Sequence, residues 1–230
     1  MTIALPSRAR LLLEQTLRLY LTVAFPFLAV MIFVRIIMSP LFTQFEYNRP
    51  GFPAEYYGFT VQERLTYAPF AIQYLLNGDD ISFLGDLRFT DGTEMYNTRE
   101  LHHMRDVKVV TQYAFAAAFF GSILALLITY FLWRSNPAAL RSALLNGSRL
   151  TIGLIFAIVI MAVTSWDRFF TTFHGLFFSD GTWQFEYSDT LIRLFPEQFW
   201  FDAALIIGGA TLLVALVTMY LTLRPSNRPL

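Results

Sequence analysis

The sequence predicts an all-α membrane protein with four transmembrane helices and a small extracytoplasmic cap. The 230-residue chain is 55% hydrophobic and 15% charged, with a mean hydropathy of +0.47, which is too apolar for an ordinary soluble domain. It contains four apolar stretches long enough to cross about 30 Å of hydrocarbon. Its acidic residues are almost confined to two of the segments that separate those stretches.

The four apolar stretches cover about residues 19–38, 109–133, 150–165 and 199–223. Each provides most of the roughly 20 residues that a helix needs to span a bilayer. We expect the whole chain, residues 1–230, to form a single membrane domain. Its two long outer loops then lie at about 40–108 and 167–198.

The first and third stretches carry features that predict their shape. Pro26 lies inside the first stretch and favours a kink there, while Arg35 near its end can extend its guanidinium toward the interface. The third stretch is the shortest of the four. We expect its helix to continue beyond the lipid, through Phe169 toward His174.

Charge placement predicts the orientation in the membrane. The two terminal segments and the connection between the second and third spans contain a single acid, Glu14. The other sixteen of the 17 acids lie in or at the edges of the two outer loops. By the positive-inside rule, both termini are cytoplasmic and both long loops face outward. The arginines that support this orientation are Arg8, Arg10, Arg18, Arg134, Arg141, Arg149, Arg224 and Arg228.

The first outer loop is long enough to form a small ordered cap. Thr60 and Glu63 form a capping box, which predicts a helix over residues 61–76. The Asn77-Gly78 pair that follows is typical of a helix end. Residues 81–96 contain an Asp-Gly turn sequence and favour a short hairpin beside the helices.

All three histidines of the chain lie just outside two predicted spans. His102 and His103 precede the second span and His174 follows the third, so all three lie on the same predicted side of the membrane. Histidine is the side chain most easily tuned for proton transfer near neutral pH. If the fold brings these stretches together, they form a reaction centre at the membrane surface.

Carboxylates accompany His103 at helical spacing. Asn97 and Glu100 resemble a second capping box, which predicts a helix that runs on into the second span. On that helix Glu100, His103 and Asp106 share a face, whereas His102 points about 100° away. A carboxylate beside a histidine fixes its tautomer and raises its basicity. The simpler alternative is a pair of solvated histidines at a helix end.

Aromatic residues follow or flank His174 along the chain, chiefly Phe173, Phe177 and Trp183. Aromatic side chains gather at membrane interfaces, so a structural aromatic belt is one interpretation. The functional alternative is an apolar slot beside the histidine that receives an acyl chain. Composition alone does not separate the two interpretations.

Several classes of function are excluded by what the sequence lacks. The absence of cysteine rules out disulfides, thiolate nucleophiles and iron–sulfur ligation. There is no Gly-x-Ser-x-Gly, Ser-x-x-Lys or His-Glu-x-x-His motif and no glycine-rich phosphate loop. Nothing suggests binding of nucleic acid. No acid lies well inside a predicted span, which argues against a proton-coupled transporter.

Two stretches of the chain carry a recognisable pattern: His103-Met104-Arg105-Asp106-Val107-Lys108 before the second span, and Phe173-His174 with Phe177 and Trp183 after the third. Together they resemble the bacterial membrane family that includes the lipoprotein intramolecular transacylase Lit. The resemblance in topology extends over most of the chain.

This resemblance implies a protein of the bacterial cytoplasmic membrane whose site faces outward. Its substrate would be a lipoprotein whose N-terminal cysteine carries a diacylglyceryl group, or another lipid ester. One acyl chain would move from the glyceryl ester to the α-amino group of that cysteine. The resemblance places the catalytic roles on His103 and His174, with Asp106 supporting them.

The reaction needs a base that deprotonates the ammonium group and a hydrogen-bond donor that stabilises the developing oxyanion. It also needs an acid that protonates the leaving alkoxide. We assign His103, oriented by Asp106 or Glu100, as the base and His174 as the oxyanion donor or acid, with the reverse assignment left open. No cofactor is required.

Two other functions fit the same residues. His103 and His174, with Glu100 and Asp106, suit an outer-face haem, copper or zinc site. Stoichiometric metal or a Soret band in the purified protein would favour that function. The other alternative is a non-catalytic integral membrane protein whose histidines are interfacial. An intact phenotype after His103→Gln would support it.

Overall fold

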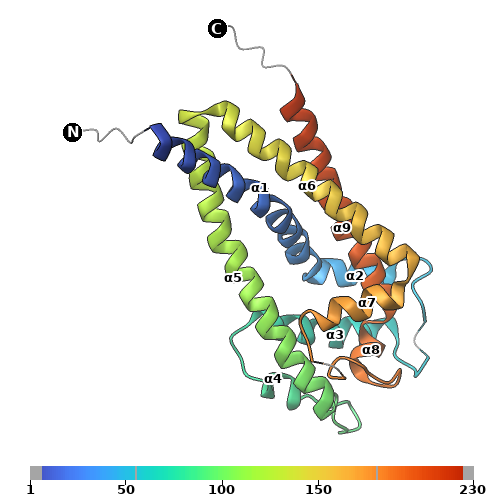
Figure 1. Cartoon of the computed structure of the whole chain (residues 1–230). Helices are drawn as coiled ribbons and strands as arrows, with labels where there is room; N and C mark the ends of the chain where they lie inside the picture. Colours follow the sequence, from blue (N-terminus) through green and yellow to red (C-terminus); the bar gives the residue numbers. More distant parts are fainter. Residues whose placement is uncertain (1–6, 55, 180, 225–230) are drawn as a thin grey trace. The chain divides into compact units, whose positions relative to one another are not determined.

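The chain is almost entirely helical (Figure 1). The computed structural model describes residues 7–54, 56–179 and 181–224. Arg228, which contributes to the orientation argument, lies outside these residues. The elements in order are α1 (Ser7–Ile37), α2 (Pro40–Asn48), α3 (Val61–Leu76), α4 (Ser82–Gly85), α5 (Thr98–Ser135), α6 (Pro137–Thr164), α7 (Trp166–Gly175), α8 (Thr190–Leu194) and α9 (Glu197–Leu223).

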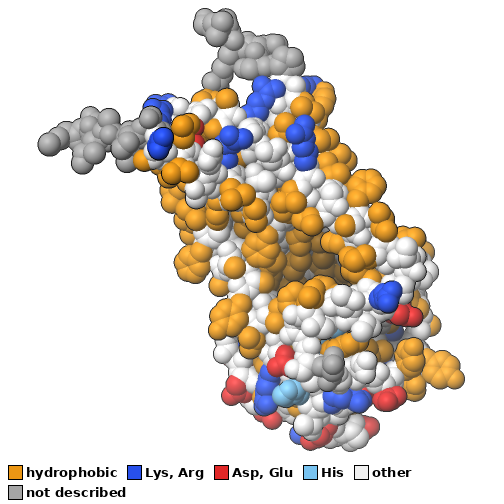
Figure 2. All heavy atoms as spheres, viewed as in Figure 1, with side chains coloured by type: hydrophobic (Ala, Val, Ile, Leu, Met, Phe, Trp, Pro, Cys, Tyr) orange, Lys and Arg blue, Asp and Glu red, His pale blue; other side chains and the backbone are white. Residues whose placement is uncertain are grey.

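Four of these helices, α1, α5, α6 and α9, are long and apolar enough to cross a membrane. Their most apolar windows have mean hydropathies between 1.9 and 2.2. Exposed large hydrophobic side chains cover much of the visible surface of these helices (Figure 2). The predicted four-helix, all-α membrane fold is therefore confirmed.

The third spanning helix begins earlier than the sequence predicts. α6 starts at Pro137, so only Asn136 separates it from α5, and the expected connection up to residue 150 is helical. Proline suits a first helical turn because its missing N–H has no partner to lose there. The Asn136 side-chain oxygen accepts a hydrogen bond from the amide of Ala139 at 3.1 Å. A search of the sequence for apolar runs misses the first turns of α6, because polar residues interrupt them.

The end of α6 also corrects an expectation. The helix does not continue through Phe169, because it stops at Thr164 and a separate helix, α7, begins at Trp166. Ser165 between them is extended, with φ −164° and ψ 102°. Its hydroxyl accepts a hydrogen bond from the Arg168 amide at 3.3 Å, which caps the new helix.

Both predicted capping boxes are present. Thr60 and Glu63 cap α3 reciprocally, and α3 covers the expected residues 61–76. At the start of α5, the Asn97 side chain accepts from the Glu100 amide at 3.0 Å, and the Glu100 carboxylate accepts from the Asn97 amide at 2.8 Å. In the stretch expected to form a hairpin, the described residues contain α4 and one bridge, between Arg88 and Glu94.

The chain divides into two compact units, and the first consists of Met1–Phe33, Ala117–Ile160 and Gly208–Leu230. Side-chain hydrogen bonds join α1 to its neighbours in this unit. Tyr20 donates to the Gly121 carbonyl of α5 at 2.8 Å, and Arg18 donates to Ser142 of α6 at 2.7 Å. Gly147 of α6 lies against Phe25 so closely that a Cβ there would be 2.8 Å from the Phe25 Cβ. Small residues thus let α1 and α6 approach each other closely.

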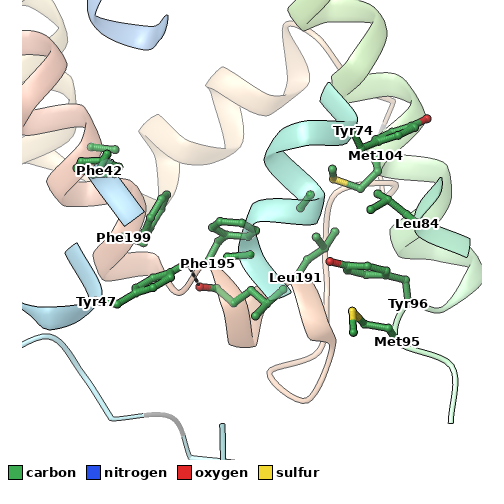
Figure 3. Close-up of a cluster of buried hydrophobic side chains, with 14 of the residues drawn as sticks. Phe42, Tyr47, Tyr74, Leu84, Met95, Tyr96, Met104, Leu191, Phe195 and Phe199 are labelled. Atoms are coloured by element: carbon green, nitrogen blue, oxygen red, sulfur yellow. Dashed lines mark hydrogen bonds between the residues drawn. The ribbon is translucent and has the colours of Figure 1, made fainter. Parts of the chain in front are cut away.

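The second unit consists of Val34–Ala116 and Met161–Ile207 and contains all three histidines. Its core gathers aromatic and aliphatic side chains from α2, α3, α5, α8 and α9 around buried Tyr96, Leu191 and Phe199 (Figure 3). The Tyr47 hydroxyl donates to the Leu194 carbonyl at 2.9 Å, which joins α2 to α8. This core supports the polar beginning of α5 and the segment that leads into α9.

Candidate active site

His103 lies in the polar beginning of α5. α5 has 38 residues, well beyond the roughly 20 that span a bilayer, and its first eleven carry most of its charge, so His103 lies before the apolar span. Its ring packs against Phe178 and Phe185, with centroid separations of 5.1 and 5.2 Å. Burial, followed by the electrostatic effect of His174, lowers the pKa of His103 to about 4.

His174 lies near the end of α7, among aromatic rings. Its centroid is 4.0 Å from that of Phe170 and 4.7 Å from that of Trp183, on which it stacks. The Nδ1 atom is 2.8 Å from the Phe170 carbonyl oxygen. A carbonyl only accepts, so Nδ1 carries the hydrogen and Nε2 keeps its lone pair. Burial lowers the pKa of His174, and this hydrogen bond opposes part of the shift.

The fold brings the two histidine stretches together. Phe178 lies 5.1 Å from His103 and 5.9 Å from His174, centroid to centroid, so both imidazoles border the same ring. The charge that His174 gains on protonation also helps to lower the pKa of His103. Two imidazoles that stay neutral in an aromatic, partly dry setting can move a proton and donate to a developing charge.

Glu100 is fully buried, and its described partners are backbone amides. Its carboxylate accepts from the amides of Asn97 and Leu191, at 2.8 and 2.7 Å. Burial raises the pKa of Glu100, and these two bonds partly offset the rise. Asp189 reinforces the junction by accepting from the Asn97 and Arg99 side chains. Glu100 therefore fixes the start of α5 to the segment that carries Phe185.

Asp106 lies nearer to the other histidine of the pair. Its carboxylate is 3.8 Å from Nε2 of His102, one helical turn away, and the His102 side chain is 60% exposed. The negative charge of Asp106 tends to raise the pKa of His103, which opposes part of the effect of burial. The Nδ1 atom of His103 is buried and has no hydrogen-bond partner among the described residues.

The predicted aromatic residues surround His174 unequally. Trp183 covers its ring, whereas Phe173 and Phe177 lie on the outer side of α7 with 47% and 49% exposure. Sequence reasoning assigned no role at the site to Phe170 or Phe185. The first is four residues before His174 on one helix, a spacing that predicts contact. The second follows Trp183 in an irregular segment and gives no comparable signal.

The described residues offer no group of three or more His, Cys, Asp or Glu side chains that would hold a metal ion. Aromatic rings flank both imidazoles, at centroid separations of 5.1 and 5.2 Å for His103 and of 4.0 and 4.7 Å for His174.

Comparison with known proteins decides the family. The family model described as "Lipoprotein intramolecular transacylase Lit" matches residues 18–200 of the chain. The chain belongs to the Lit family. This confirms the resemblance that the two histidine stretches carry.

Individual relatives of the chain agree with membership of the Lit family. An uncharacterised protein of Aquifex aeolicus (strain VF5) is 29% identical over 212 residues, which are 90% of this chain and 94% of that protein. The solved structure of Bacillus cereus Lit has a TM-score of 0.72 and 20% identity, and covers 91% of this chain and 94% of its own. A histidine-to-arginine variant of that protein gives a TM-score of 0.63 at 18% identity, over 94% and 95% of the two chains. The Lit fold is thus shared over nearly the full length.

Proposed function

We propose that this chain is a membrane acyltransferase of the Lit type. It moves an acyl chain from the diacylglyceryl group of a lipoprotein to the α-amino group of the N-terminal cysteine, and leaves a lyso-form lipoprotein. Family membership supports this reaction class. The observation that carries the assignment to residues is the pair of imidazoles, His103 and His174, which both border Phe178.

The reaction can proceed within one substrate molecule. The amine nitrogen attacks the ester carbonyl carbon, the bond from that carbon to the glyceryl oxygen breaks, and the amine proton finally resides on the glyceryl hydroxyl. Because ester and amine belong to one lipid-anchored molecule, proximity supplies much of the acceleration. No acyl-enzyme is needed, which agrees with a chain that has no cysteine. The protein has to move one proton and stabilise one oxyanion.

The geometry supports the reverse of the first assignment of roles. His174 is the better base, since its Nδ1–H is held by the Phe170 carbonyl and its Nε2 lone pair is free to accept the amine proton. His103, with a pKa of about 4, stays neutral and donates an N–H to the oxyanion. A neutral donor does not compete with the base for the proton.

The aromatic rings serve both binding and water exclusion. We assign Trp183, Phe173 and Phe177 to contact with the acyl chains, since they extend from His174 to the outer side of α7. Removing water strengthens the electrostatic effect of the single N–H donor. It also protects the ester from hydrolysis.

We further propose that the site faces outward from the cytoplasmic membrane and that both termini are cytoplasmic. The N-terminal segment and the short connection between the second and third spans carry a single acid, Glu14, and six arginines: Arg8, Arg10, Arg18, Arg134, Arg141 and Arg149. By the positive-inside rule these arginines support a cytoplasmic position for the two segments, and therefore an outward-facing position for both histidine stretches.

The test is mass spectrometry of a lipoprotein N-terminal peptide from bacteria that lack other N-acylating enzymes. Cells with the wild-type chain should yield the lyso-form with an amide-linked acyl chain. His103→Ala and His174→Ala should each abolish it, because base and donor act in one transition state. His102→Ala is the matched control and should retain conversion. Full conversion by the double variant at positions 103 and 174 would overturn the mechanism.

A further inference from the structure

α7 carries a continuous row of aromatic rings along one side. Trp166, Phe169, Phe173 and Phe177 follow one another with centroid separations of 5.7, 6.4 and 5.3 Å. We call these four residues the aromatic ladder. Their spacing of three or four residues keeps them on one face of a helix and of the turn that follows it.

Among the described residues, no element covers the later part of the aromatic ladder, where Phe173 and Phe177 are 47% and 49% exposed, whereas Trp166 and Phe169 are half-buried. None of the ten residues of α7 is buried, although four of them are tryptophan or phenylalanine. The opposite side of α7 is polar and also exposed, with Asp167, Arg168, Thr171 and Thr172. A helix with one aromatic and one polar side lies stably in the boundary region of a bilayer.

Two observations favour lipid over a protein partner as what covers the ladder. α7 follows Ser165 directly after α6, which is long and apolar enough to span the membrane. Trp166, the first ring of the ladder, packs edge-on against Phe201 of α9 at 5.6 Å, and α9 is another such helix. The ladder is therefore joined to lipid-facing surface at its beginning, where aromatic residues favour the interface.

His174 lies between the two sides of α7. With 100° between successive residues, it falls beside Phe170 and Phe177 on one flank and Asp167 and Thr171 on the other. The ester linkages of diacylglyceryl lipids occupy the corresponding boundary between hydrocarbon and headgroups. His174 thus lies at the boundary between the apolar and polar sides of α7, and the lipid esters lie at the boundary between the apolar and polar regions of the bilayer.

We propose that the aromatic ladder lies in the outer-leaflet hydrocarbon and holds His174 at the depth of lipid ester linkages. The catalytic imidazole then meets the ester where the bilayer already holds it, and the substrate does not have to be lifted out. This inference rests on the proposed transacylase function for its consequence, but the depth of α7 is measurable without any activity.

The first experiment is a spin-label scan along α7 in lipid vesicles. Because the chain has no cysteine, single substitutions by cysteine give one label each. Labels at positions 169, 173 and 177 should be several-fold more accessible to oxygen than to a water-soluble nickel complex, relative to labels at 168, 172 and 175. The ratio should repeat with a period of about 3.6 residues. High accessibility to the nickel complex at all six positions would overturn the proposal.

The second experiment separates depth from contact with substrate. Phe173→Ser with Phe177→Ser should lower kcat/KM several-fold for a diacylglyceryl lipopeptide in vesicles, and much less in detergent micelles, where ester depth is not fixed. Thr171→Ala with Thr172→Ala, on the polar side, is the matched control and should change neither value. Equal losses in both media would refute the depth role. An inactive wild-type protein would instead refute the transacylase function, while the spin-label result would still decide the position of α7.

Discussion

The imidazole of His174 lies nearly parallel to the indole of Trp183, with centroids 4.7 Å apart and ring planes 28° apart. The imidazole also contacts Phe170 at 4.0 Å, and Phe170 contacts Trp183 at 5.9 Å, so the two rings meet the imidazole from adjacent directions. These two contacts hold the ring together with the hydrogen bond from its Nδ1–H to the Phe170 carbonyl. Its orientation is fixed without any carboxylate.

This arrangement predicts that Trp183 is needed for activity. Trp183→Ala should lower kcat for lyso-lipoprotein formation by roughly ten- to a hundredfold, since a base displaced by about 1 Å loses that much. Trp183→Phe should retain most of the activity because a ring remains. Tyr187→Ala is a suitable control, because Tyr187 is 80% exposed in the same loop. Unchanged kcat in Trp183→Ala would contradict the positioning role.

A second prediction concerns the protonation of His103. Its pKa of about 4 lies below the ordinary value of 6.5, so the unfolded chain binds this proton more tightly than the folded protein. The free energy of unfolding should therefore fall as the pH drops from about 6.5 toward 4. Replacing His103 removes this contribution. Between pH 7 and pH 5, the Tm of His103→Gln should fall less than the Tm of the wild-type protein.

The same pKa can be observed directly. In NMR titration of the histidine side chains, His103 should remain neutral at pH 5, and His174 should titrate below 6.5. If His103 were protonated at pH 6.5, its proposed role as a neutral donor would be lost.

A third prediction separates the two carboxylates near the histidines. Glu100→Gln should lower the free energy of unfolding by about 1–3 kcal/mol. The Asn97 and Leu191 amides donate to different carboxylate oxygens, and in glutamine one of these positions becomes an NH2 group that cannot accept. The substitution should also lower activity by displacing Phe185. Asp106→Asn should cost far less stability and only modestly reduce the rate. Thermal unfolding and kcat/KM of the two variants, measured together, provide the test.

A fourth prediction concerns the packing of α1 on α6. Gly147→Ala should destabilise the protein by about 1–3 kcal/mol, since the new Cβ would lie 2.8 Å from Phe25 and would force the helices apart. Gly153→Ala in the same helix is the control, because a Cβ there meets nothing within 4 Å. Gly153→Ala should be neutral or slightly stabilising. Equal thermal stability of the two variants would count against close packing at Gly147.

A fifth prediction tests the orientation. Single cysteines introduced at Gly85 and Ala138 should react differently with a membrane-impermeant thiol reagent in intact cells. Position 85 should be labelled from outside, and position 138 only after the membrane is opened. The reverse pattern would place the histidines on the cytoplasmic side.

The sequence predicted the spans and the beginnings of α3 and α5 because each has a local cause. Apolar runs indicate spanning helices, and the pairs Thr60–Glu63 and Asn97–Glu100 specify helix starts by short-range hydrogen bonds. The break at Ser165 was missed because a serine within an apolar and aromatic stretch is compatible with a continuous helix.

The pairing of His103 with His174 follows from topology and family resemblance, but the details of the site depend on contacts between distant residues. Glu100 shares a helical face with His103, yet it bonds to the Leu191 amide, more than ninety residues away in sequence. Helical spacing gives no information on such partners. For the same reason, the stacking of Trp183 on His174 had to be read from the fold.

The extended backbone of Ser165 has a consequence for catalysis in bilayers of different thickness. A spanning helix adjusts to a thinner or thicker bilayer chiefly by changing its tilt. If α6 and α7 were one rod, each change of tilt would swing His174 through an arc. Because Ser165 interrupts the helix, a change in the tilt of α6 need not be carried over into α7. Catalysis should therefore depend only weakly on lipid chain length and on the growth temperature that sets it.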